Sequence, residues 1–125
     1  VKPLGLLTTL PKKVLFVCTQ NKFRSVTAEH LFRGRSDMEV RSAGVASDAR
    51  VPITAELLAW ADEVYVFERR HRNILHKRFP ELYSAKSIVC LYVPDEFEFM
   101  SPELVSILTN KLQRYLGPPS GNRAD

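Results

Sequence analysis

The chain has 125 residues, 45% of them hydrophobic and 26% charged, which fits one globular domain and excludes a second domain of ordinary size. No apolar run approaches the length that spans a bilayer, and no signal peptide is visible, so we expect a protein that does not bind membranes. The two cysteines, Cys18 and Cys90, form no disulfide framework, which is typical of a cytoplasmic protein. The net charge of +4 suits a phosphorylated ligand, whereas the basic residues from Arg69 to Arg78 are predicted to form a solvated helix face rather than a nucleic-acid patch.

The first predicted element is a strand over Lys12–Val17, because an apolar run with no polar face is typical of a buried parallel strand. Residues 1–11 show no period and are predicted to be a flexible leader. A helix is predicted from Ser25 to about Gly34, with Ser25 as its N-cap. Cys18 therefore lies on a loop that leads into a helix N-terminus, where backbone N–H groups and the helix dipole favour an anion and a thiolate.

Arg24 ends this loop, six residues after Cys18. A cation opposes the dipole at a helix N-terminus, so stability alone does not explain the arginine. A guanidinium can instead grip a phosphate through two parallel hydrogen bonds. We therefore predict that Cys18 and Arg24 face one bound phosphate group; the alternative is a buried strand cysteine beside a solvated arginine.

Strands and helices alternate along the rest of the chain. The predicted strands are Met38–Ser42, Glu63–Phe67 and Ser87–Val93, and the predicted helices are Pro52–Trp60, Arg69–His76 and a last helix from the cap Ser101 to Leu116. Phe79-Pro80 should break the third helix, and Gly117 with two prolines should end the last one. Residues 12–117 would form the domain, and 118–125 a disordered tail.

This alternation predicts an α/β fold: a three-layer α/β/α sandwich with a four-stranded parallel sheet and a phosphate-binding loop after strand one. Ligands in such sheets bind beyond the carboxyl ends of the strands. Cys18, Ser42, Glu68 and Asp95 each follow a predicted strand, so we expect them to gather at that edge.

Several blocks of the sequence resemble one known family. Val14–Ser25, followed by Ala28-Glu29 and Phe32, is similar to the N-terminal signature of the low-molecular-weight protein tyrosine phosphatases. Later blocks of that family match Ser42-Ala43-Gly44, Ala61-Asp62 and Glu68-Arg69-Arg70-His71, and the likeness extends over roughly Lys13–Leu116. The resemblance implies a phosphatase that forms a cysteinyl-phosphate and needs no metal or other cofactor.

The resemblance also implies roles for single residues. Cys18 would be the nucleophile, Arg24 would stabilise the transition state, and Asp95 would be the general acid, with Glu96 as the alternative acid because it stands where the family usually has proline. Asp95 read alone would be a turn aspartate. The residues that would bind the substrate phosphate are Thr19, Gln20, Asn21, Lys22, Phe23, Arg24 and Ser25. Asn21, Ser25, Ser42 and His71 would support this loop by hydrogen bonds.

Three departures from the family's pattern leave the substrate open. Phe23 stands where many relatives have a second cysteine, and Lys22 stands where tyrosine phosphatases are usually apolar and arginine phosphatases have threonine. The loop after Gly44 lacks the usual aromatic, and Phe97 is the candidate replacement.

Phosphotyrosine in proteins is the favoured substrate, and other phosphorylated compounds, including small phosphomonoesters and phosphoramidates, are the alternative. An arsenate-reductase-like enzyme would have only Cys90 for a relay. The alternative that is not an enzyme is a module that binds phosphate or a phosphopeptide without turning it over. Inorganic phosphate or another oxyanion should bind in each case.

Overall fold

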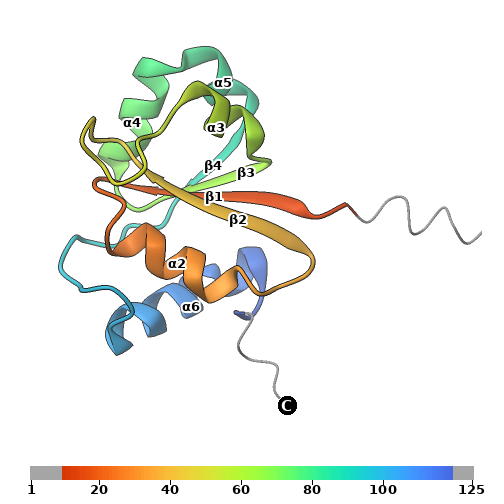
Figure 1. The fold of residues 1–125 in the computed structure, drawn as a ribbon, viewed down its shortest axis with the longest axis vertical. Helices are drawn as coiled ribbons and strands as arrows, with labels where there is room; N and C mark the ends of the chain where they lie inside the picture. The colour runs from red at the N-terminus through yellow and green to blue at the C-terminus, as the bar shows by residue number, and fades with distance from the viewer. Residues whose placement is uncertain (1–9, 120–125) are drawn as a thin grey trace, which may run out of the picture.

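The sheet organises the computed structural model, which describes residues 10–119 (Figure 1). Its four strands are all parallel and lie in the order β2-β1-β3-β4. Their bounds are Lys12–Cys18 for β1, Met38–Gly44 for β2, Glu63–Val66 for β3 and Ser87–Cys90 for β4. The predicted four-stranded parallel sheet is therefore confirmed.

Helices cover both faces of the sheet and complete the predicted three layers. α2 (Arg24–Phe32) and α6 (Pro102–Leu116) lie on one face, and α3 (Ala55–Trp60), α4 (Arg69–Arg78) and α5 (Pro80–Ala85) lie on the other (Figure 1). In α6 the buried residues recur every fourth position, at Leu104, Leu108, Leu112 and Leu116. This spacing turns one apolar stripe of the helix toward the sheet.

β1 lies between β2 and β3, and its residues 14–17 have no exposed surface. Successive side chains of a strand point to opposite faces, so the strand serves two cores. Val14, Phe16 and Cys18 belong to the core under α2 and α6, whereas Leu15 and Val17 belong to the core under the other three helices. The position of Cys18 is therefore fixed by the most deeply buried strand of the fold.

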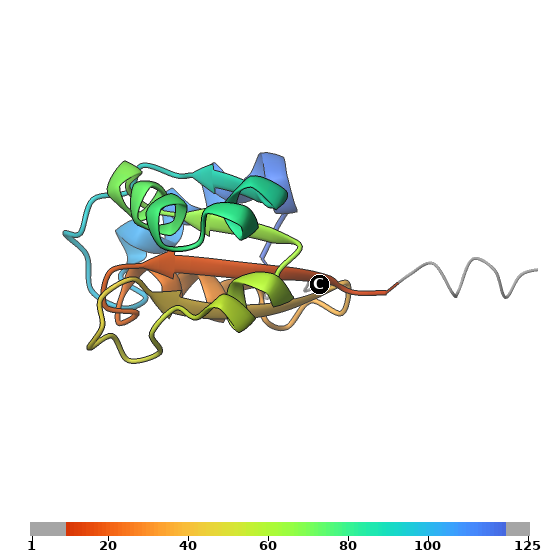
Figure 2. The same cartoon turned by 90° about the horizontal axis from the view of Figure 1, so that it is seen from above.

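The loops that follow β1, β2 and β4 gather at one end of the molecule (Figure 2). Because the strands are parallel, their carboxyl ends share this edge. The fold thus brings together segments that lie far apart in the sequence, as the alternation of strands and helices predicts.

Two predicted element boundaries, the start of α3 and the end of β4, are wrong by three residues, and the end of β2 is at Gly44 rather than Ser42. α3 begins at Ala55 rather than Pro52, because the Thr54 side chain caps it by accepting a hydrogen bond from the Leu57 N–H at 3.1 Å. Pro52 instead pairs with Gly44 in an isolated bridge. β4 ends at Cys90 rather than Val93, because the backbone of Tyr92 turns into the left-handed region with φ of 56°.

Other differences are smaller. The chain after Phe79 forms the short helix α5, which the sequence analysis did not predict, although α4 does end before this residue. Most of the predicted leader (1–11) and tail (118–125) lies outside the described residues, so the domain limits stay predictions. Between residues 10 and 119, no helix is long and apolar enough to cross a membrane.

Candidate active site

The loop of residues 19–23, between β1 and α2, is held by the segment that follows β2. The Val45 N–H donates to the Cys18 carbonyl at 2.9 Å, and the Ala46 N–H donates to the Thr19 carbonyl at 3.0 Å. Arg50 donates through its backbone to the Gln20 carbonyl and through Nε to the Asn21 carbonyl. The carbonyl groups at the start of the loop therefore face the segment after β2.

The N–H groups of the same loop remain available. None of the N–H groups of residues 19–23 donates a hydrogen bond to any group within residues 10–119. Asn21 adopts a left-handed conformation with φ of 58°, which lets the loop curl tightly. Successive free N–H groups in a tight loop beside a helix N-terminus form a concave site for an anion.

Gly44 explains how closely the two segments approach. A Cβ atom at this position would lie 2.4 Å from the Thr19 carbonyl oxygen and 3.0 Å from the Asn21 nitrogen. No ordinary side chain fits against backbone atoms at these distances. The glycine at the end of β2 therefore sets the shape of the loop after β1.

A buried chain of hydrogen bonds leads to the Cys18 sulfur. Asn21 Nδ2 donates to Ser25 Oγ at 2.7 Å and to Ser42 Oγ at 2.9 Å, and Ser42 Oγ donates in turn to Glu29. The Cys18 Sγ atom lies 3.0 Å from Ser25 Oγ. Because Ser25 already accepts from Asn21, its single hydroxyl proton is free to point at the sulfur. Such a donor stabilises a thiolate.

The predicted N-cap role of Ser25 is therefore wrong. α2 begins at Arg24, with Phe23 in the N-cap position and no side-chain cap. The Ser25 hydroxyl is directed to Cys18 and Asn21, and these two contacts decide its orientation.

Arg24 is buried, with an exposed fraction of 1%. Its Nη1 atom donates to Glu68 Oε2 at 2.6 Å and to the Val93 carbonyl at 2.8 Å, and its Nη2 atom lies 3.8 Å from Asp95 Oδ2. A buried charge is tolerated when it is paired in this way. The guanidinium is thus tied to segments that follow β3 and β4.

Glu68 pairs with two arginines. Its second oxygen accepts from Arg70 Nε at 2.8 Å. Partial burial opposes ionisation of Glu68, but the hydrogen bonds from Arg24 and Arg70 outweigh it and lower the pKa of the carboxyl group. Glu68 therefore stays charged and holds Arg24 in place.

His71 connects α4 to the loop. Its Nδ1 accepts from the N–H groups of Phe67 at 3.3 Å and Glu68 at 3.0 Å, which places the ring proton on Nε2. Nε2 lies 2.9 Å from Thr19 Oγ1 and donates to it. Burial, with the nearby Arg24 charge as the next cause, lowers the pKa of His71 to about 4. The imidazole is therefore neutral in the folded protein.

A small pocket brings together some of the predicted site residues, but Thr19, Asn21 and Ser25 do not line it. It is lined by Cys18, Gln20, Lys22, Phe23, Arg24 and Asp95. Glu96 and Phe97 line a different pocket, against α6, and Phe97 packs on the core beneath it. The fold thus brings Asp95 beside Cys18 and separates Glu96 from it. Phe97, the candidate replacement for the missing aromatic, does not line the small pocket.

The profile of the family described as "Low molecular weight phosphotyrosine protein phosphatase" matches residues 13–81, more than half of the chain. The chain belongs to this family. Membership makes it a phosphatase, a hydrolase of the type that depends on a cysteine. No curated protein sequence matches the chain.

Solved structures of low molecular weight phosphatases share the fold. The tyrosine phosphatase Wzb from Escherichia coli K30, in complex with phosphate, is 20% identical with a TM-score of 0.70, over 85% of this chain and 96% of that one. A YwlE mutant from Bacillus subtilis is 26% identical with a TM-score of 0.61, over 84% and 98% of the two chains. The YwlE arginine phosphatase from Geobacillus stearothermophilus is 23% identical with a TM-score of 0.63, over 85% and 93%.

Sequence reasoning missed two arginines of this candidate site. Arg50 holds the loop carbonyls, and Arg70 donates to Thr19 Oγ1 at 2.6 Å. Glu68 and Arg70 belong to one family block, which could have marked them, but their pairing depends on the turn into α4. No local pattern marks Arg50. Within residues 10–119, no cluster of three or more histidine, cysteine or acidic side chains is suited to a metal ion.

Proposed function

We propose that this phosphatase hydrolyses phosphotyrosine in proteins through a cysteinyl-phosphate intermediate. The observation that carries the proposal is the surrounding of the Cys18 sulfur. The Ser25 hydroxyl lies 3.0 Å from it, free loop N–H groups follow it, and Arg24 and Asp95 line the same small pocket. A nucleophile, an anion cradle, a charge clamp and an acid are thus adjacent.

In the first step, the Cys18 thiolate attacks the phosphorus atom, so that a P–S bond forms and the P–O bond to the leaving group breaks. The N–H groups of residues 19–23, with Arg24, hold the three non-reacting phosphoryl oxygens. Asp95 donates its proton to the leaving oxygen. Tyrosine is released with its hydroxyl group restored.

In the second step, a water molecule gives a proton to the Asp95 carboxylate and attacks phosphorus. The P–S bond breaks, inorganic phosphate leaves, and the electron pair returns to the Cys18 sulfur. The Ser25 hydroxyl, oriented by Asn21, donates to this leaving thiolate. Ser42 and His71 keep Asn21 and Thr19 in place.

Lys22 supports a phosphate ester over phosphoarginine as the substrate. Lys22 lines the small pocket together with Arg24, so that two cations border it. The guanidinium of phosphoarginine would bring further positive charge to this position, whereas a phenyl ring would not. Phosphoarginine is the second candidate because the chain is 26% identical to the B. subtilis YwlE mutant and similar to an arginine phosphatase.

The test compares hydrolysis of p-nitrophenyl phosphate, a phosphotyrosyl peptide and a phosphoarginyl peptide by the wild type and by Cys18→Ser. We expect the wild type to turn over the first two and to favour the tyrosyl over the arginyl peptide. Cys18→Ser should lose turnover but still bind vanadate or phosphate, because the N–H cradle remains. Near wild-type turnover by the serine variant contradicts the mechanism, and preference for the arginyl peptide contradicts the substrate.

The two cysteines, both free in the structure, also support a cytoplasmic location, where thiols stay reduced. A fractionation experiment that finds the protein in an oxidising compartment would contradict this part of the proposal.

A further inference from the structure

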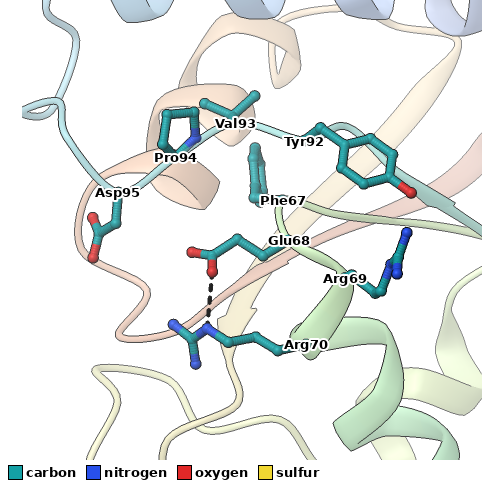
Figure 3. A pocket seen from close by; sticks show the side chains of 8 residues that line it. All are labelled: Phe67, Glu68, Arg69, Arg70, Tyr92, Val93, Pro94 and Asp95. Carbon is teal, nitrogen blue, oxygen red and sulfur yellow. Dashed lines mark hydrogen bonds and ion pairs between the residues drawn. The ribbon is translucent and has the colours of Figure 1, made fainter.

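A second and larger pocket adjoins the small pocket that contains Cys18. Its volume is about 590 Å³, and it lies between the start of α4 and residues 92–95 (Figure 3). Asp95 lines both pockets, so they share one wall. Phe67 and Val93, both buried, contribute to its apolar lining. A substrate segment next to the phosphorylated residue would lie against this second pocket.

Among the residues that the structure describes, one cation in this pocket has no side-chain partner. Both Glu68 oxygens are occupied, one by Arg24 and one by Arg70. Arg70 is further engaged with Thr19. Arg69 is exposed and forms no hydrogen bond or ion pair through its side chain with any residue between 10 and 119. The Arg69 guanidinium is therefore available to an anion from outside.

Tyr92 faces this arginine from the opposite side of the pocket (Figure 3). The neighbouring N–H groups of Leu91 and Val93 donate to the Val66 and Phe67 carbonyls, both at 2.8 Å. Between these two anchors Tyr92 has a φ of 56° and leaves 56% of its surface exposed. A bulky residue in the left-handed region is strained, and such strain is concentrated at functional sites. Here it presents an aromatic ring to the pocket.

We propose that this pocket is a subsite for an acidic side chain that flanks the phosphorylated residue of a protein substrate. Arg69 pairs with the carboxylate, and the Tyr92 ring packs against the apolar part of the same segment. Asp95 repels a carboxylate from the end nearest Cys18, which places the acid toward Arg69. The inference rests on the proposed phosphatase function and deepens it, since it names the class of protein sequence that the enzyme prefers.

The experiment measures the ratio of kcat/KM for two phosphotyrosyl peptides, one with aspartate on both sides of the phosphotyrosine and one with asparagine. A partly exposed ion pair is worth up to about 1 kcal/mol, so the wild type should prefer the aspartate peptide by about fivefold at low salt. The ratio should fall toward one in Arg69→Gln and be partly kept in Arg69→Lys. It should also shrink near 1 M salt, where the screening length is about 3 Å.

Lys77→Gln is the matched control, because it removes an exposed cation from the same helix outside the pocket and should keep the wild-type ratio. A wild-type ratio near one, or an unchanged ratio in Arg69→Gln, overturns the subsite while p-nitrophenyl phosphate is still hydrolysed. A wild type that hydrolyses no phosphate ester overturns the proposed function and the subsite together. Because each ratio compares two peptides with the same variant, a change in activity that affects both peptides equally leaves the ratio unchanged.

Discussion

The Arg24 side chain is charged and buried, and two hydrogen-bond acceptors fix the position of its guanidinium. Glu68 and the Val93 carbonyl both accept hydrogen bonds from Nη1, while Nη2 lies 3.8 Å from Asp95 Oδ2, beyond hydrogen-bond distance. Lysine has the same charge but cannot hold these partners and a phosphate at once. We expect Arg24→Lys to lose more than tenfold in kcat/KM, which corresponds to at least ~1.4 kcal/mol of transition-state stabilisation. Thermal unfolding monitors whether the variant is folded, and a folded variant with near wild-type kcat/KM contradicts the role.

The Ser25 hydroxyl lies 3.0 Å from the Cys18 sulfur and can donate a hydrogen bond to it. Hydrogen bonds to charged groups are worth about 1.5–3 kcal/mol, so its loss should slow departure of the thiolate by about tenfold or more. Ser25→Ala should therefore release the first p-nitrophenol rapidly and then turn over slowly, as a burst in stopped-flow kinetics. Ser84→Ala, at an exposed serine of α5, should behave as the wild type. Unchanged kcat without a burst would show that Ser25 has no part in the second step.

Asp95 and Glu96 can be separated by their dependence on the leaving group. p-Nitrophenolate leaves without a proton, whereas an unactivated phenol or alkyl oxygen needs one. Asp95→Asn should therefore slow unactivated substrates far more than p-nitrophenyl phosphate, by about 10²-fold. Glu96→Gln is the matched control, because Glu96 lines a pocket away from Cys18. The opposite pattern in the two variants would assign the acid to Glu96.

At the scale of elements, the end of β2 and the loop after β1 form one unit. Gly44→Ala would place a methyl group 2.4 Å from the Thr19 carbonyl oxygen, so the loop must shift. We expect the variant to fold but to bind vanadate at least about tenfold more weakly, because N–H groups that have moved cannot contact all the oxygens together. Isothermal titration measures the affinity, and circular dichroism checks the fold. Wild-type affinity in a folded variant would contradict the coupling of the two segments.

The elements also show what the sequence can and cannot predict. The apolar run of β1 predicts its burial because a strand covered on both faces has no polar side. The start of α2 is mispredicted because the Ser25 hydroxyl is bound by Asn21 and Cys18, which no local pattern reveals. Similarly, Pro52 suits a first helical turn, but its bridge to Gly44 prevails. Local signals fail where a tertiary contact, even one to a residue nearby in the sequence, binds the same group.

The candidate site likewise contains features that the sequence predicts and contacts that only the folded structure reveals. The Cys18–Arg24 spacing and the residues after each strand predict which side chains gather at the edge of the sheet. The pairing of Arg24 with Glu68 joins residues 44 positions apart and depends on the strand order, so it is visible only in the fold. The lack of a side-chain partner for Arg69 within residues 10–119, and the left-handed turn at Tyr92, likewise have no local signal.

At the scale of the whole molecule, the neutral His71 makes stability depend on pH. The unfolded chain protonates this histidine below about pH 6.5, whereas the folded protein keeps it neutral until its pKa of about 4 is reached. The unfolded state thus binds more protons in this window, and the free energy of unfolding should fall as the pH decreases from 6.5 toward 4, by up to about 3 kcal/mol. Above pH 6.5 the histidine is neutral in both states, so this loss of stability is absent there.

Urea unfolding between about pH 7 and pH 5 measures this dependence above the range in which carboxylates such as Glu68 titrate. His71→Gln should be less stable at pH 7 but should show a flatter profile. A wild-type free energy of unfolding that stays constant over this range would contradict a depressed histidine pKa.

The central position of β1 has a consequence for the order in which this enzyme matures during synthesis. The ribosome makes Cys18 and its loop first, yet the loop needs Gly44 beside it, and Arg24 needs partners 44 and 69 residues further along the chain. Until Val93 has left the exit tunnel, the Arg24 guanidinium lacks its final anchor. A nascent chain therefore carries the proposed nucleophile long before its proposed phosphate site is complete, so a segment that is translated early becomes competent only when later segments have folded around it.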